Sequence, residues 1–148
     1  MKIKLKNIEV INLTRELYGT VMILPGNLPP RQITKGILAY PLNGVARKRL
    51  NRLGLKLKEE NQSIEDTKAK LLETYGKKIG DQWVPIARDE KTGDYKSKAD
   101  EKKAKAFEDE MTKILEDTIE VEVDLLDEKD LPTTEENYEI TFTKLVKQ

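Results

Sequence analysis

Hydrophobic residues recur at steps of three and four along the segment that follows Pro41. The positions that carry this pattern are Leu42, Ala46, Leu50, Leu53, Leu57, Ile64, Leu71 and Tyr75. At about 100° per residue they fall on one side of a helix, so the pattern predicts a long amphipathic helix over 41–75. Pro41 suits its first turn, and Gly76 ends it. Ser63 and Asp66 have capping-box spacing, which would let the helix restart after a bend near Asn61.

Three further helices are expected from shorter patterns. The segment 99–117 carries an apolar face formed by Ala104, Phe107, Met111, Ile114 and Leu115. It can pair antiparallel with the long helix. Asn7 can cap a helix that ends at Gly19. A short helix is expected over about 32–40, after a loop over 20–30 that holds three prolines.

Alternation of polar and apolar residues predicts the strands. Ile119, Val121, Val123 and Leu125 alternate with acidic residues, which indicates a half-buried strand over 119–125. Ile3 and Leu5 alternate with lysines in the same way. For 134–146 a capping-box spacing favours a helix and a β-branched run favours a strand. We favour a strand that pairs with 119–125.

The predicted fold class is α+β, an antiparallel helical hairpin with a small antiparallel β-sheet. A length of 148 residues fits a single domain over 1–148. Within it, 77–98 forms an exposed excursion. Trp83, Val84 and Ile86 indicate one strand there, and the turn-like residues 89–94 favour a β-hairpin.

Composition removes several kinds of chemistry. The chain has no cysteine and no histidine, which excludes disulfides, thiolate or imidazole metal sites, and catalysis by Ser-His-Asp or Cys-His groups. The Met1–Lys6 segment lacks the apolar run of a signal peptide, and no run is long enough to span a bilayer. We therefore expect a cytoplasmic protein without cofactor or membrane contact.

The net charge of zero conceals two opposite halves. Residues 1–60 hold 12 basic and 4 acidic side chains, and residues 61–148 hold 15 basic and 23 acidic ones. Such an asymmetry indicates a partner, or two halves that neutralise each other. Homo-oligomers stay open as well, because opposite faces on one chain can join between subunits.

A basic face on the long helix is the first candidate site. It consists of Arg47, Lys48, Arg49, Arg52 and Lys56. A cluster of this kind binds a protein partner or neutralises nucleic-acid phosphates. A solvated helix face, or pairing with the acidic half of the chain, would also explain it. No aromatic residue is interleaved with it, which weakens the case for single-strand stacking.

An acidic surface is the second candidate, and it admits three interpretations. It consists of Glu116, Glu120, Glu122, Asp124, Asp127, Glu128 and Asp130. Carboxylates at period two lie about 7 Å apart on one face of a strand. With water and a phosphate substrate, Glu120, Glu122 and Asp124 could hold Mg²⁺. Alternatively, the surface imitates phosphates and occupies a partner's basic groove, or it keeps an edge strand soluble.

An apolar loop is a third candidate site. Val21 to Leu24, with Leu28, form either a surface that contacts a partner or a small satellite of the core.

Three segments follow one another in a characteristic order along the chain. They are Leu71-Leu72-Glu73-Thr74-Tyr75-Gly76, then, after a variable excursion, Phe107-Glu108-Asp109-Glu110, and last Ile119-Glu120-Val121-Glu122-Val123. This order resembles small uncharacterised proteins of bacteriophages and prophages of Gram-positive hosts. The resemblance covers about 42–126 and transfers no catalytic residue.

The resemblance implies a phage origin and a role without catalysis. We therefore expect a non-enzymatic factor for virion assembly, accessory functions or host takeover, which binds a host or virion protein in the host cytoplasm through its charged surfaces. Nucleic-acid binding by the basic face is the alternative. A metal-dependent enzyme built on the strand carboxylates is a third hypothesis.

Overall fold

The computed structural model describes residues 1–127 and residue 129, and it has an α+β fold. The chain divides into two compact units. The first contains 1–61 and the described residues from Thr118 onward, and the second contains 62–117. The expected single domain stays a prediction. No helix in the described part of the chain is long and apolar enough to cross a membrane.

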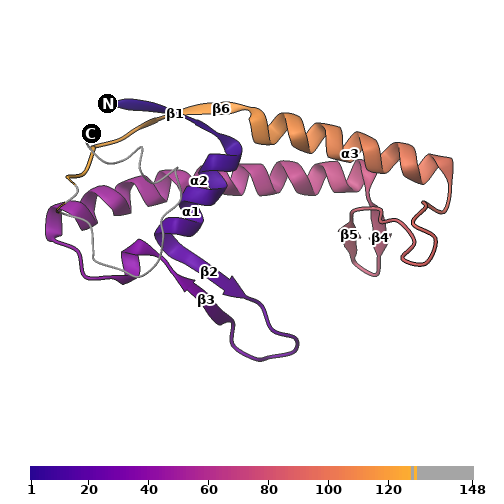
Figure 1. Cartoon of the computed structure of the whole chain (residues 1–148), viewed down its shortest axis with the longest axis horizontal. Coiled ribbons are helices and arrows are strands. Elements are labelled where there is room, and N and C mark those ends of the chain that lie inside the picture. Colours follow the sequence, from indigo (N-terminus) through magenta and orange to yellow (C-terminus); the bar gives the residue numbers. More distant parts are fainter. Residues whose placement is uncertain (128, 130–148) are drawn as a thin grey trace. The chain divides into compact units, whose positions relative to one another are not determined.

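The first unit begins with a strand and a helix that match expectation (Figure 1). Strand β1 spans Lys2–Lys6, and helix α1 spans Asn7–Tyr18. A Glu9 carboxylate oxygen accepts a hydrogen bond from the Lys6 N–H at 3.0 Å, which satisfies one donor at the helix start. Gly19 ends the helix with a φ of 82°, a conformation that favours glycine.

Two strands flank the loop expected over 20–30, which is shortened to 23–30, and the second strand replaces most of the short helix expected over 32–40. Strand β2, Gly19–Met22, pairs antiparallel with strand β3, Arg31–Lys35, with an irregular register between Thr20 and Val21. Figure 1 shows this hairpin projecting away from α1. The expected helix over 32–40 was wrong, because Ile33 and Thr34 suit a strand, and only Ile37–Ala39 forms a single 3₁₀ turn, η1.

Helix α2 spans Gly44–Tyr75 and confirms the long helix, with two differences. Its start lies three residues after Pro41, because the Asn43 side-chain oxygen accepts a hydrogen bond from the Ala46 N–H at 2.9 Å. The expected restart at Ser63 is wrong. Asp66 instead accepts a hydrogen bond from the Gln62 side chain at 2.8 Å, within one unbroken helix.

Most of the buried core lies in the first unit. Strand β6, Thr118–Glu122, pairs antiparallel with β1, and Leu5 lies opposite Ile119. The expected partner of this strand, 134–146, lies outside the described residues. The core of the unit is formed by side chains from β1, α1, η1, α2, β6 and the segment that follows β6. These side chains are Leu5, Val10, Leu13, Leu17, Ile37, Ala46, Leu50, Leu53, Leu57, Val121, Val123 and Leu126. The predicted stripe of α2 is therefore buried here as far as Leu57.

The second unit holds the end of α2, a hairpin and helix α3. Strands β4, Lys77–Ile79, and β5, Gln82–Val84, form a β-hairpin that turns at Gly80. The excursion contains a hairpin, but not the expected one: it lies before the turn over 89–94, and Ile86 is not part of its second strand. Helix α3, Lys98–Glu116, runs opposite to the end of α2 (Figure 1), and the Ser97 hydroxyl caps it by accepting from the Asp100 N–H.

Candidate binding surfaces

The basic face of α2 is partly engaged within the first unit. Arg47 donates to the carbonyl oxygens of Leu38 at 3.0 Å and Tyr40 at 2.9 Å. These bonds hold the chain around η1 against the start of α2. Arg47 is therefore a structural residue as well as a member of the predicted site.

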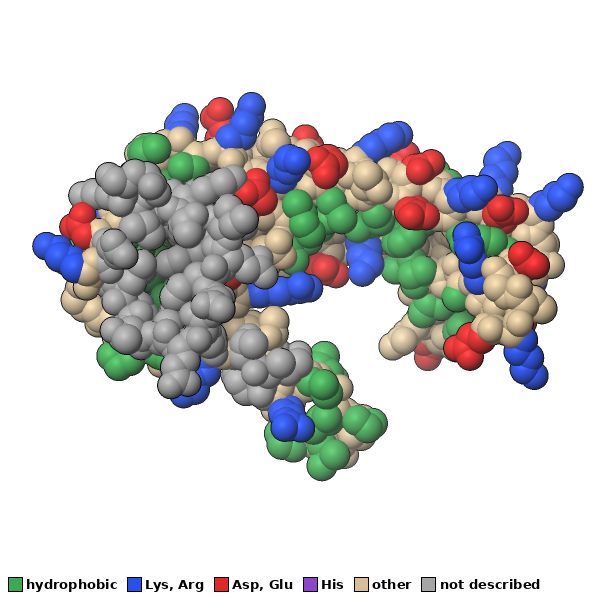
Figure 2. All heavy atoms as spheres, in the orientation of Figure 1, with side chains coloured by type: hydrophobic (Ala, Val, Ile, Leu, Met, Phe, Trp, Pro, Cys, Tyr) green, Lys and Arg blue, Asp and Glu red, His purple; other side chains and the backbone are tan. Residues whose placement is uncertain are grey.

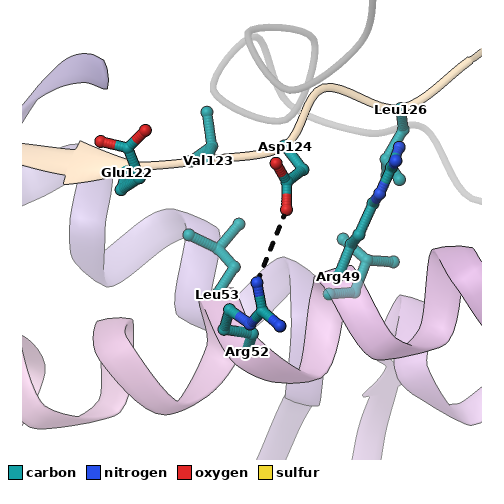
Figure 3. Close-up of a pocket in the computed structure, with 8 residues that line it drawn as sticks. Arg49, Arg52, Leu53, Glu122, Val123, Asp124 and Leu126 are labelled. Carbon is teal, nitrogen blue, oxygen red and sulfur yellow. Dashed lines mark ion pairs between the residues drawn. The ribbon is translucent and has the colours of Figure 1, made fainter. Parts of the chain in front are cut away.

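Two more arginines of this face bind the segment that follows β6 (Figure 3). Arg49 donates to the Leu125 carbonyl oxygen at 3.1 Å, and an Arg52 guanidinium nitrogen lies 3.8 Å from an Asp124 carboxylate oxygen. Leu53 and Leu126 are among the residues that line a small hollow beside these contacts. The basic and acidic regions of the sequence therefore meet in the folded chain at this point.

Lys48 and Lys56 complete the predicted basic face, and both are exposed. Arg52 also keeps most of its side chain in solvent, with 70 % exposed. An ion pair of such exposed groups contributes little to stability. Three cations of the predicted face therefore remain accessible to an anionic ligand.

The acidic strand face lies beside lysines of β1. Lys2 is opposite Glu122, and Lys4 is opposite Glu120, on the exposed side of the sheet. Opposite charges at directly paired strand positions attract each other. The Met1 ammonium group also lies 3.0 Å from a Glu122 carboxylate oxygen. The face is therefore mixed in charge rather than purely acidic.

The three carboxylates proposed as a metal site do not face one way. Strand β6 ends at Glu122, and Asp124 turns toward Arg52 on α2 while Glu122 points away from that helix (Figure 3). Among the described residues, no group of three acidic side chains could hold a metal ion. The geometry therefore does not assemble the Mg²⁺ site that the alternation suggested.

The other members of the predicted acidic surface lie at both ends of β6. Glu116 ends α3 in the second unit, and Asp127 follows Leu126 in the first. Both residues make interactions of their own. Glu128 and Asp130 lie outside the described residues. The seven predicted residues are therefore divided among the first unit, the second unit and the part of the chain outside the described residues, and one surface made of all of them stays a prediction.

The tip of the β2–β3 hairpin carries the clearest exposed apolar cluster. Ile23 is 85 % exposed, Leu28 61 % and Met22 49 %. Figure 2 shows hydrophobic side chains gathered at the end of this hairpin. Arg31 lies opposite Met22 in the hairpin register, which places a cation beside the cluster. We refer to Met22, Ile23, Leu28 and Arg31 as the hairpin tip.

The sequence pattern indicated the apolar residues of this tip, but it did not predict that they lie at the end of a β-hairpin. Pro25-Gly26-Asn27 lies in a loop as predicted, and Gly26 has a φ of 75° that suits the reversal of the chain between the two strands. The β-branched pair Ile33-Thr34 was the signal for the returning strand. With both signals combined, a hairpin with an apolar end could have been predicted.

A polar depression in the second unit offers no comparable site. Arg88, Asp94, Tyr95, Ser97 and Glu101 are among the residues that line it. A hydrogen bond to the Tyr95 side chain raises the pKa of Arg88 above its usual value. Ser97 is occupied as the cap of α3. The depression is lined by cationic and anionic side chains together, so its charges do not favour a ligand of one sign.

No family model, curated protein or solved structure matches this chain in comparisons with known proteins.

Proposed function

We propose that this chain is a non-enzymatic protein-binding factor whose main contact element is the hairpin tip. The observation that carries the proposal is the exposure of Ile23, Leu28 and Met22 on a projecting hairpin. Large apolar side chains grouped at the surface are typical of interaction sites. Burying them against a partner would remove apolar area from water, which favours association.

The charged surfaces take a secondary role in this proposal. Arg47 and Arg49 are hydrogen-bonded within the first unit, and Glu120 and Glu122 lie opposite lysines. Charges that are already paired contribute less to binding than charges that a partner must neutralise. The role in phage assembly, accessory functions or host takeover, and the cytoplasm of the host as its location, belong to the same proposal.

A crosslinking experiment tests the hairpin tip. Because the chain has no cysteine, Ile23→Cys gives a single attachment point for a photoreactive label. We expect the labelled protein to crosslink to one protein in nuclease-treated host lysate. Leu55→Cys is the control, because Leu55 is also exposed, at 67 %, but lies on α2. Equal crosslinking from both positions would count against the proposal.

Nucleic-acid binding is the second candidate, and one observation favours it. No acidic residue occurs from Leu17 to Lys58, and Lys48, Arg52 and Lys56 are exposed along α2. If this face binds phosphates, Lys48→Glu with Lys56→Glu should weaken binding, and added salt should weaken binding of the unmodified chain. An affinity for nucleic acid that neither the two substitutions nor added salt reduces would reject this candidate.

A further inference from the structure

Helix α3 presents an apolar face that its own unit leaves partly open. No residue of α3 is buried, although Phe107, Met111 and Ile114 share one side of the helix. In Figure 2, hydrophobic side chains are visible among the charged ones of the second unit. These side chains are mostly covered within the chain, and a contact with another surface would bury the apolar area that each still exposes.

Acidic residues accompany the second half of this helix. From Phe107 to Asp117 the chain has five acidic residues and one basic residue, Lys113. On the helical wheel Glu108 and Glu110 flank the apolar face on its two sides. A carboxylate oxygen of Glu110 lies 3.4 Å from the ammonium nitrogen of Lys113. The Glu108 side chain is exposed to solvent. The face is therefore apolar with an acidic border.

The hairpin tip has the complementary composition. It presents Ile23 and Leu28 with Arg31 beside them, in a stretch from Leu17 to Lys58 that contains no acidic residue. An apolar tip with a cation fits an apolar face with carboxylates, both in burial and in charge. Both surfaces occur once on every copy of the chain.

We propose that the hairpin tip of one copy docks on the acidic, apolar face of α3 in a second copy. Ile23 and Leu28 pack against Phe107 and Met111, and Arg31 lies near Glu108. Because the two surfaces differ, the contact is head-to-tail and leads to rings or open chains. This inference rests on the proposed function, since it names a partner for the same hairpin tip.

Sedimentation velocity of the full chain over a range of concentrations tests the inference. The contact is small, so we expect a Kd on the order of 10 to 100 µM. Ile23→Asp with Leu28→Asp should raise the Kd by at least about tenfold, because it places charge in the apolar contact. Leu55→Asp is the matched control and should leave the association unchanged.

Mixing two defective variants makes the test specific to a head-to-tail contact. One variant has a defective tip, Ile23→Asp with Leu28→Asp, and the other a defective face, Met111→Glu. Each should be monomeric alone. Their mixture keeps one intact tip and one intact face, so it should form a 1:1 pair and nothing larger. A mixture that stays monomeric while the unmodified chain associates would overturn the inference.

Charge reversal at exposed residues guards against a face variant that fails to fold. Arg31→Glu and Glu108→Arg should each weaken self-association, and their combination in one chain should restore it. If the pair weakens association additively, the proposed orientation is wrong. Circular dichroism checks that every variant keeps its helix content.

Two other results would overturn the inference. The first is an unmodified chain that stays monomeric up to about 500 µM, well above the expected Kd. In that case crosslinking from Ile23→Cys still decides the proposed function independently. The second is a monomer whose Ile23 and Leu28 are needed to bind phosphatidylglycerol vesicles, which would assign the tip to a lipid surface.

Discussion

At the scale of single residues, two close approaches join the parts of the first unit. At Gly36 a side chain would meet the backbone of Leu17 and Tyr18 at the end of α1. At Gly54 it would meet the Tyr18 ring. Lys58, one turn further along α2, places its ammonium 3.8 Å from the centre of that ring. The Tyr18 ring at the end of α1 therefore packs against α2 at Gly54 and Lys58.

Replacement of Gly36 should be far more harmful than replacement of Gly44. In Gly36→Ala the new methyl group would collide with backbone that cannot move aside, which should cost about 2–4 kcal/mol of the free energy of unfolding. Gly44→Ala adds a methyl group in open space at the start of α2, so it should stabilise the fold by up to about 1 kcal/mol. Urea unfolding of both variants measures the difference. Equal effects would contradict the close approach.

The position of Tyr18 also predicts a dependence on alkaline pH. Burial raises the pKa of the Tyr18 hydroxyl above its usual value. The unfolded chain then releases this proton first, so stability is complete below a pH of about 10 and falls as the pH rises through the folded-state pKa. An absorbance titration of Tyr18→Phe should lack one tyrosine that ionises above the usual pKa in the unmodified chain. Loss of an early-ionising tyrosine instead would reject this assignment.

At the scale of elements, the sequence predicted helices better than strand pairing. The apolar stripe from Ala46 to Leu57 correctly predicted which face of α2 is buried, because a period of 3.6 residues can be recognised within one segment. The partner of β6 was not predictable in the same way. β1 and β6 lie at nearly opposite ends of the described chain, and no pattern within either strand specifies the other.

The start of α2 provides a test of the cap that the structure assigns. Asn43→Ala removes the acceptor for the Ala46 N–H and should cost about 1 kcal/mol. Ser63→Ala is the control. If Ser63 lies inside one helix, its replacement should change stability by no more than about 0.5 kcal/mol. A loss at Ser63 as large as that at Asn43 would instead support a second helix start there.

At the scale of the whole molecule, the opposite charges of the two sequence halves are partly explained by their contacts. The segment after β6 is contacted by Arg49 and Arg52. The carboxylates of β6 lie opposite Lys2 and Lys4, and Glu122 also pairs with the Met1 ammonium group. Composition alone left this pairing and an external partner equally open. The choice depends on contacts between distant residues, which a charge count does not contain.

The two arginines that contact this segment should differ in importance. Arg49→Met leaves the Leu125 carbonyl without its donor in a part-buried position, which should cost about 1–2 kcal/mol. Arg52→Met breaks only an exposed ion pair with Asp124 and should cost less than about 1 kcal/mol. Thermal unfolding of both variants compares them. A larger loss for Arg52→Met would contradict this account of the contact.

The central claim is that the hairpin tip is the contact element, and two leucines of similar exposure test it most directly. Leu28 is 61 % exposed at the tip, and Leu55 is 67 % exposed on α2. The measurement is the amount of a host or virion protein that the tagged chain retains after nuclease treatment. We predict that Leu28→Ser reduces retention at least about tenfold, while Leu55→Ser leaves it unchanged. Unchanged retention by Leu28→Ser, or retention of nucleic acid alone, would contradict the account.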